Sequence, residues 1–106
     1  MDNEADISFL MITKNEGHNL EKCISNLFSI SKNIYVLDSF STDNTVSILK
    51  KYHITFKQNK FKNFGDQWNL AIKIFNIKSS WVMKIDPDEF IDDQLKKYNL
   101  TDKDLA

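Results

Sequence analysis

The sequence predicts an α/β protein built on a mostly parallel, open sheet, with elements in the order β-α-β-α-β-α-β. Two observations lead to this prediction. Four short apolar runs, rich in β-branched and aromatic residues, alternate with segments in which apolar residues recur at helical spacing. The chain also contains only two glycines and one proline, so few residues interrupt the regular elements. Alternation of this kind is typical of parallel strands joined by right-handed helical crossovers.

The first half of the chain contains two predicted strands and two predicted helices. Residues 7–13 (ISFLMIT) form a nearly continuous apolar run, which is typical of a strand buried on both faces. Apolar residues then recur at helical spacing in residues 17–29, and residues 33–38 (NIYVLD) form a second buried strand. The side chains of residues 41–43 (STD) can cap a second amphipathic helix that extends to Tyr52.

The second half repeats the alternation. Residues 53–56 form a short third strand, and a polar loop with three lysines follows at residues 57–62. Apolar residues at helical spacing predict a third helix over residues 64–75, with Trp68 on its apolar face. Residues 81–85 (WVMKI) form a fourth strand, which an Asp-Pro pair stops. A last short helix is expected over residues 92–98.

Composition excludes several classes of function. A length of 106 residues fits a single domain covering residues 1–106. A net charge of −1 argues against nucleic-acid binding, which requires an excess of cations, so we expect no nucleic-acid partner. All 14 cationic residues are lysines, so any bound phosphate would depend on lysine, backbone amides or a metal ion.

The sequence also predicts where the protein resides. No apolar stretch approaches the roughly 20 residues that span a bilayer, and the acidic N-terminus does not resemble a signal peptide. We therefore expect a cytoplasmic protein, with a place at the cytoplasmic face of a membrane as the alternative. The single cysteine, Cys23, falls in an apolar helical pattern and is expected to be a small buried residue, not a nucleophile.

Polar residues follow three of the predicted strands directly. The first strand leads into residues 13–16 (TKNE), the second ends in Asp38, and the fourth leads into residues 86–89 (DPDE). In an open parallel sheet these strand ends lie side by side, where ligands bind. Such crowding of carboxylates is unfavourable unless a cation joins them, and a hard divalent cation is the natural partner. Asp86 and Asp88 are separated by one residue, so both can face one site.

Four segments of the chain, in order, share features with a known enzyme family. They are ISFLMITKNEGHNLEKCISNL, NIYVLDSFSTDNTVSILKKY, NFGDQWNLAI and WVMKIDPDEF. Together they resemble the motifs of family 2 glycosyltransferases, in particular the branch similar to lipopolysaccharide-core glucosyltransferases. The resemblance implies the N-terminal, nucleotide-sugar-binding half of a GT-A fold, which is Rossmann-like, and a sugar transfer from a nucleoside diphosphate to an acceptor hydroxyl.

The resemblance also implies roles for individual residues. Thr13 and Glu16 would line the pocket for the base and ribose, and Asp38 would accept a hydrogen bond from the nucleobase, as expected for uracil. Asp86 would contact the ribose or a metal-bound water. Asp88 would bind Mn²⁺ or Mg²⁺ at the diphosphate, with Asp86 as the second residue of the metal site.

The resemblance also implies a lysine near the diphosphate, and three residues of this chain depart from the family pattern. Lys60, or its neighbour Lys62, would help to screen the diphosphate. Lys14 occupies a position where many members have an aromatic residue that can stack on the base. Phe40 replaces the usual glycine of the second-strand motif, and Trp68 replaces a cation.

The resemblance does not extend to the catalytic base. Family enzymes are considerably longer than this chain, and their second half supplies the acceptor site and the base. We therefore nominate no catalytic residue and expect donor binding without efficient turnover by this chain alone.

Two alternatives to a hexosyltransferase-type enzyme stay open. One is a nucleotide-sugar-binding module without activity, and the other is a degenerate domain that serves protein interaction and self-associates through its exposed apolar faces. A nucleotidyltransferase ranks lower, because its glycine-rich phosphate loop is missing. The sugar and the glycan, lipid or protein acceptor are not predicted.

Overall fold

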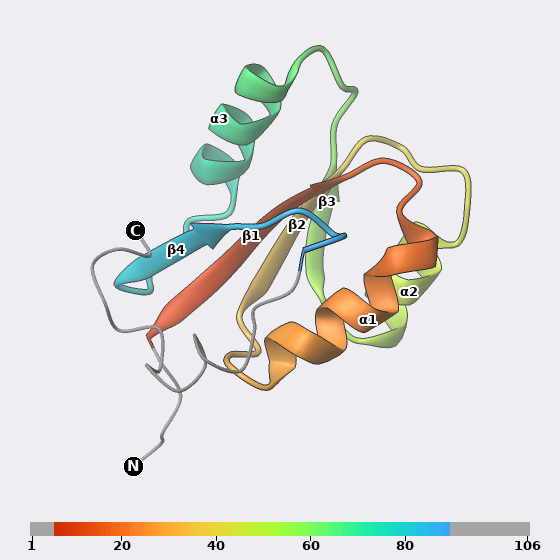
Figure 1. The fold of residues 1–106 in the computed structure, drawn as a ribbon. Coiled ribbons are helices and arrows are strands. Elements are labelled where there is room, and N and C mark those ends of the chain that lie inside the picture. Colours follow the sequence, from red (N-terminus) through yellow and green to blue (C-terminus); the bar gives the residue numbers. More distant parts are fainter. Residues whose placement is uncertain (1–5, 90–106) are drawn as a thin grey trace.

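The four strands of the chain form one parallel sheet in the order β3-β2-β1-β4 (Figure 1), in a computed structural model that describes residues 6–89. This confirms the predicted α/β fold. The predicted helix over residues 92–98 lies outside the described residues. The elements are β1 (Ile7–Thr13), α1 (Gly17–Phe28), β2 (Ile34–Asp38), α2 (Thr45–Lys51), β3 (Thr55–Gln58), α3 (Phe64–Ile74) and β4 (Trp81–Lys84).

Strand β1 is the centre of the sheet. It pairs with β2 on one side and with β4 on the other, and all seven of its residues are buried, as the apolar run predicts. Thr13, the last residue of β1, lies opposite Asp38, the last residue of β2. Strand β4 is placed so that Leu10 lies opposite Lys84, and the chain beyond β4 therefore continues beside the end of β1.

Helices cover both faces of the sheet, as crossover connections require. Helices α1 and α2 pack on one face, where alternate β1 residues such as Phe9 and Met11 enter the larger apolar cluster. Helix α3 lies on the opposite face (Figure 1), where Leu10 and Ile12 meet Ala71 in a smaller cluster. Among residues 6–89, no helix is long and apolar enough to cross a membrane.

Strand β3 begins at Thr55, so the prediction of a strand over residues 53–56 was two residues too early. The reason is the way in which α2 ends. His53 has a φ of 57°, and its amide and that of Ile54 donate to the carbonyls of Lys50 and Leu49. This is the Schellman pattern of helix termination, with a residue in the left-handed conformation just after the helix.

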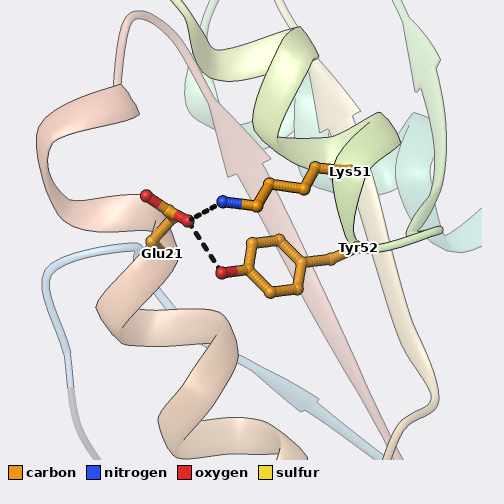
Figure 2. A network of polar contacts seen from close by, with 3 residues as sticks. All are labelled: Glu21, Lys51 and Tyr52. Carbon is orange, nitrogen blue, oxygen red and sulfur yellow. Dashed lines mark hydrogen bonds and ion pairs between the residues drawn. The ribbon is translucent and has the colours of Figure 1, made fainter.

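Helices α1 and α2 are joined at the surface by a polar contact (Figure 2). One carboxylate oxygen of Glu21 accepts from the Tyr52 hydroxyl at 2.7 Å and from the Lys51 ammonium at 3.0 Å. The hydrogen bond from Tyr52, followed by the contact with Lys51, holds the pKa of Glu21 below its ordinary value. Because these side chains are exposed, the contact orients the two helices but contributes little to stability.

Cys23 lies on the inner face of α1, within the larger apolar cluster. Burial, followed by the charges of Glu89 and Asp88, raises the pKa of its thiol to about 12. The thiolate is the reactive form of cysteine, so this side chain is inert at neutral pH. The prediction of a small buried residue is confirmed.

Candidate functional site

The carboxyl ends of β1 and β2 are joined through the Asp38 side chain. Asp38 is completely buried and accepts four hydrogen bonds. The donors are the Thr13 hydroxyl at 2.6 Å, the Ser41 hydroxyl at 2.5 Å, the Ser41 amide at 2.8 Å and the Gln58 side-chain amide at 3.1 Å. One carboxyl group thus connects the ends of three strands, β1, β2 and β3.

Two loops follow these strand ends and bind each other; we call residues 14–16 and 39–44 the paired loops. The side-chain oxygen of Asn15 accepts from the amides of Thr42 at 2.7 Å and Asp43 at 3.2 Å. The Asn15 amide donates in turn to the Ser41 hydroxyl at 2.8 Å. Asn15 has a φ of 54°, a conformation that asparagine tolerates better than most residues. The polar residues of the paired loops therefore bond largely to one another.

Asp43 joins the paired loops to the starts of α1 and α2. Its two carboxylate oxygens accept from the amides of Gly17 at 3.0 Å and Thr45 at 2.9 Å, and also from the Thr45 hydroxyl. Desolvation is the largest single effect and raises the pKa of Asp43, but the hydrogen bonds from Thr45 and Gly17 together outweigh it and lower the pKa overall. The predicted capping by residues 41–43 is thus made by Asp43, although the N-cap position itself is Asn44, without a side-chain cap.

Phe40 adopts a φ of 52°, in the left-handed region that favours glycine. A glycine, which the resemblance to family 2 glycosyltransferases implies at this position, would adopt this conformation without a steric cost. The Phe40 ring is 54% exposed and does not belong to either apolar cluster, so its packing does not compensate for the backbone strain.

The third strand to end at this edge of the sheet is β4, and a tight turn at residues 86–89 follows it. The Asp86 amide donates to the Glu89 carboxylate at 2.7 Å, and the Glu89 amide donates to the Asp86 carbonyl at 2.9 Å. Partial desolvation, followed by the charges of Glu89 and Asp88, raises the pKa of the Asp86 carboxyl group above its ordinary value. A cation at this turn would relieve the repulsion that contributes to this shift.

These three strand ends enclose a pocket of about 500 Å³, a size typical of small-molecule sites. Its wall combines carboxylates that follow two strand ends with the ring of Phe61, from the loop before α3, and the ring of Phe64, the first residue of α3. The lining residues are Ile12, Thr13, Lys14, Glu16, Ser39, Phe61, Phe64, Asp86, Pro87 and Asp88.

The pocket brings together four of the six residues predicted for the site: Thr13, Glu16, Asp86 and Asp88. Asp38 lies beneath the surface and is not part of the pocket lining, because its carboxyl group is buried among its four donors. Lys60 lines a second depression of about 480 Å³ beside α3, together with Lys62 and other residues. The structure therefore does not bring Lys60 into the carboxylate pocket.

Within the described part of the chain, no three His, Cys, Asp or Glu side chains are arranged so that they could hold a metal ion by themselves. Asp86 and Asp88 do present two carboxylates to one pocket. Mg²⁺ commonly binds through one or two carboxylates, with water and substrate phosphates as its other ligands. The residues present therefore fit a metal that binds together with a diphosphate.

Sequence reasoning missed three residues of this region. Gln67 is buried in α3, and its side-chain amide donates to the Ser39 hydroxyl at 2.9 Å, which ties α3 to the paired loops. The sequence signal for Gln67 was its place on the side of the predicted helix that faces the sheet, where a polar residue needs a hydrogen-bond partner. Phe61 and Phe64 line the pocket, and the signal for Phe61 was its alternation with Lys60 and Lys62.

Comparison with known proteins agrees with this geometry. The family model described as Glycosyl transferase family 2 matches residues 8–102. An uncharacterized glycosyltransferase of Rickettsia bellii is 32% identical over 90 residues, which are 85% of this chain and 30% of the relative. The glycosyltransferase SunS of Bacillus subtilis is 36% identical over 81 residues, which are 74% of this chain and 19% of SunS.

Among solved structures, the crystal structure of S. aureus TarS, residues 1–349, superposes with a TM-score of 0.67 at 23% sequence identity. The match covers 89% of this chain and 31% of the TarS chain, and it confirms the GT-A type of fold. The chain belongs to glycosyl transferase family 2. It spans less than a third of the length of the relatives described above.

Replacing Phe40 tests the backbone strain. Phe40→Gly and Phe40→Ala both remove the exposed ring, but only glycine adopts the left-handed conformation at no steric cost. We expect the glycine variant to have a free energy of unfolding about 1 kcal/mol higher than that of the alanine variant, measured by urea denaturation. Equal stabilities would show that the loop is not strained at this residue.

The Asp43 contacts predict a pH-dependent contribution to stability. We expect Asp43→Ala to lower the free energy of unfolding by about 1 kcal/mol at pH 7, because two amides lose their acceptor. The folded-state pKa of Asp43 is lowered. Its charged form therefore stabilises the fold above the unfolded pKa of about 3.9, and that part is lost as the pH falls through the folded-state value.

Urea denaturation at several pH values between 3 and 7 measures the difference in free energy of unfolding between wild type and Asp43→Ala. Asp43→Asn, which keeps an oxygen acceptor without the charge, is the matched control and should show a smaller loss. A difference between wild type and Asp43→Ala that stays constant down to pH 3 would contradict the assignment.

Proposed function

We propose that this chain binds the donor of a glycosyltransferase, a nucleoside diphosphate sugar, in the pocket at the carboxyl ends of β1, β2 and β4. The observation that carries the proposal is the convergence of Asp86, Asp88 and Glu16 on one pocket beside the end of the central strand. Membership of glycosyl transferase family 2 supports this reading, because donor and acceptor binding are general to the family. A uridine diphosphate sugar is the donor that we favour, from the resemblance noted in the sequence.

In this proposal Asp88 and Asp86 would hold Mn²⁺ or Mg²⁺ together with the oxygens of the diphosphate. The bound metal would supply Lewis-acid stabilisation of the departing nucleoside diphosphate. Two reciprocal hydrogen bonds between Asp86 and Glu89 hold the backbone of this turn, so the backbone that carries the two carboxylates does not have to be ordered when the ligand arrives. Thr13 and Glu16 line the same pocket and would contact the nucleoside.

Transfer of the sugar to an acceptor is the second part of the proposal. The match to the Rickettsia bellii relative covers 30% of its length, so an acceptor site and a base would be contributed by regions with no counterpart here. We expect hexosyl transfer for the whole enzyme and donor binding without efficient turnover for this chain alone. Cytoplasmic location and self-association stay predictions from the sequence.

Calorimetric titration of UDP into the chain tests donor binding. We expect binding in the presence of Mn²⁺, and we expect EDTA to abolish it. Asp88→Ala should weaken binding at least about tenfold, because the metal would lose a carboxylate ligand. Asp66→Ala is the matched control, since Asp66 is an exposed carboxylate that lines the second depression instead of the pocket.

Unchanged affinity in Asp88→Ala, with wild-type binding intact, would refute the assignment of the metal site. Metal-independent binding of UDP would refute the role of the cation. If none of the common nucleoside diphosphates bound to the wild-type chain, the donor-site proposal itself would be wrong for this chain.

A further inference from the structure

Two phenylalanine rings at the pocket are exposed and form a pair. Phe61 is 41% exposed and Phe64 is 67% exposed. Their ring centroids lie 5.1 Å apart with an angle of 73° between the planes, an edge-to-face arrangement. Neither ring belongs to the two apolar clusters of the core, yet both line the pocket that contains Asp86 and Asp88. The pair is therefore an aromatic surface that lies outside the core and shares a pocket with the carboxylates of Asp86 and Asp88.

The local backbone directs these rings to the pocket and the neighbouring lysines away from it. Lys60 and Lys62 line the second depression, whereas Phe61, between them, lines the carboxylate pocket. Alternation of this kind is the period-two pattern of extended chain. Asn63 then caps α3, accepting from the Asp66 amide at 2.8 Å, and Phe64 is the first helical residue. The cap fixes the second ring beside the first.

The paired loops provide no aromatic ring on the pocket wall. Lys14 lines the pocket, and its ammonium group donates to the Ser39 carbonyl at 2.9 Å. Phe40, the aromatic residue of the paired loops, is exposed but is not part of the pocket lining. In the described part of the chain, the aromatic lining of this pocket comes from Phe61 and Phe64 alone.

We propose that Phe61 and Phe64 form the stacking surface for the nucleobase of the bound nucleoside diphosphate. The inference rests on the proposed donor site and names the residues that bind the base. A pocket wall with both aromatic rings and carboxylates suits a ligand that joins a planar, uncharged ring to a metal-bound diphosphate. The ring-binding surface is formed by the β3–α3 connection, through Phe61, and by the first residue of α3, Phe64.

Titration of two variants and two kinds of ligand tests the inference. The variants are Phe61→Leu and Phe64→Leu, which keep an apolar side chain, and the control is Phe40→Leu, an exposed phenylalanine outside the pocket. The first ligand is whichever of UDP, GDP, CDP and ADP binds wild type most tightly with Mn²⁺. The second is methyl diphosphate, which has no base.

We expect each pocket variant to bind the nucleoside diphosphate at least about fivefold more weakly, as the loss of one aromatic stacking contact implies. Affinity for methyl diphosphate should stay at the wild-type value, and Phe40→Leu should match wild type for both ligands. Circular dichroism melting curves confirm that each variant is folded.

The outcomes separate this inference from the proposed function. Normal binding of the nucleoside diphosphate by both pocket variants overturns the stacking role and leaves the donor site intact. Equal losses for the two ligands also overturn it, because the rings would then act on the diphosphate or on the shape of the pocket. Absence of nucleoside diphosphate binding in wild type overturns the proposed function and, with it, this inference.

Discussion

The buried carboxyl group of Asp38 is the contact on which the functional edge of this sheet depends. It accepts hydrogen bonds from the ends of β1 and β3 and from the loop after β2. Removing one partner from a buried polar contact costs more than the contact contributes, because the others are left unsatisfied. Loss of this carboxyl group would leave the buried Thr13 hydroxyl without its acceptor. The ends of β1, β2 and β3 would then lose the side chain that connects them.

The pocket follows from that arrangement. Once β1 and β2 end together, the loops after them lie close enough for Asn15 to accept from two amides of the neighbouring loop. Asp43 then orients the starts of α1 and α2. Most polar residues of the paired loops, such as Asn15 and Asp43, therefore bond within the protein, whereas Asp86 and Asp88, on the turn after β4, line the pocket.

Much of the fold could be predicted from the sequence, because apolar runs and helical spacing report directly on burial. The convergence of Asp86 and Asp88 with Thr13 and Glu16 was also predictable, since parallel strands bring their carboxyl ends to one edge. Membership of glycosyl transferase family 2 was indicated by four motifs in order and is confirmed by the family match.

Other features depend on side-chain direction and backbone detail, which sequence patterns do not report. Asp38 was predicted to face the nucleobase, but it is buried beneath the pocket, and its contact with a base stays a prediction. Lys60 and Phe61 are adjacent in sequence, yet Phe61 lines the pocket with Asp86 and Asp88, whereas Lys60 lines the second depression beside α3. The start of β3 was misplaced because His53, a residue without strong conformational preference, takes the left-handed position that ends α2.

Amide hydrogen exchange in wild type and in Asp38→Asn tests most directly whether Asp38 organises this edge. The informative amides are those of Glu16 and Thr42, which donate to Thr45 and Asn15 and make no direct contact with Asp38. If Asp38 organises this edge, the protection of these two amides falls about tenfold or more in the variant, while the amides of α1 keep theirs. Unchanged protection at Glu16 and Thr42, with nucleotide binding alone reduced, would contradict it and would make Asp38 a ligand-binding residue only.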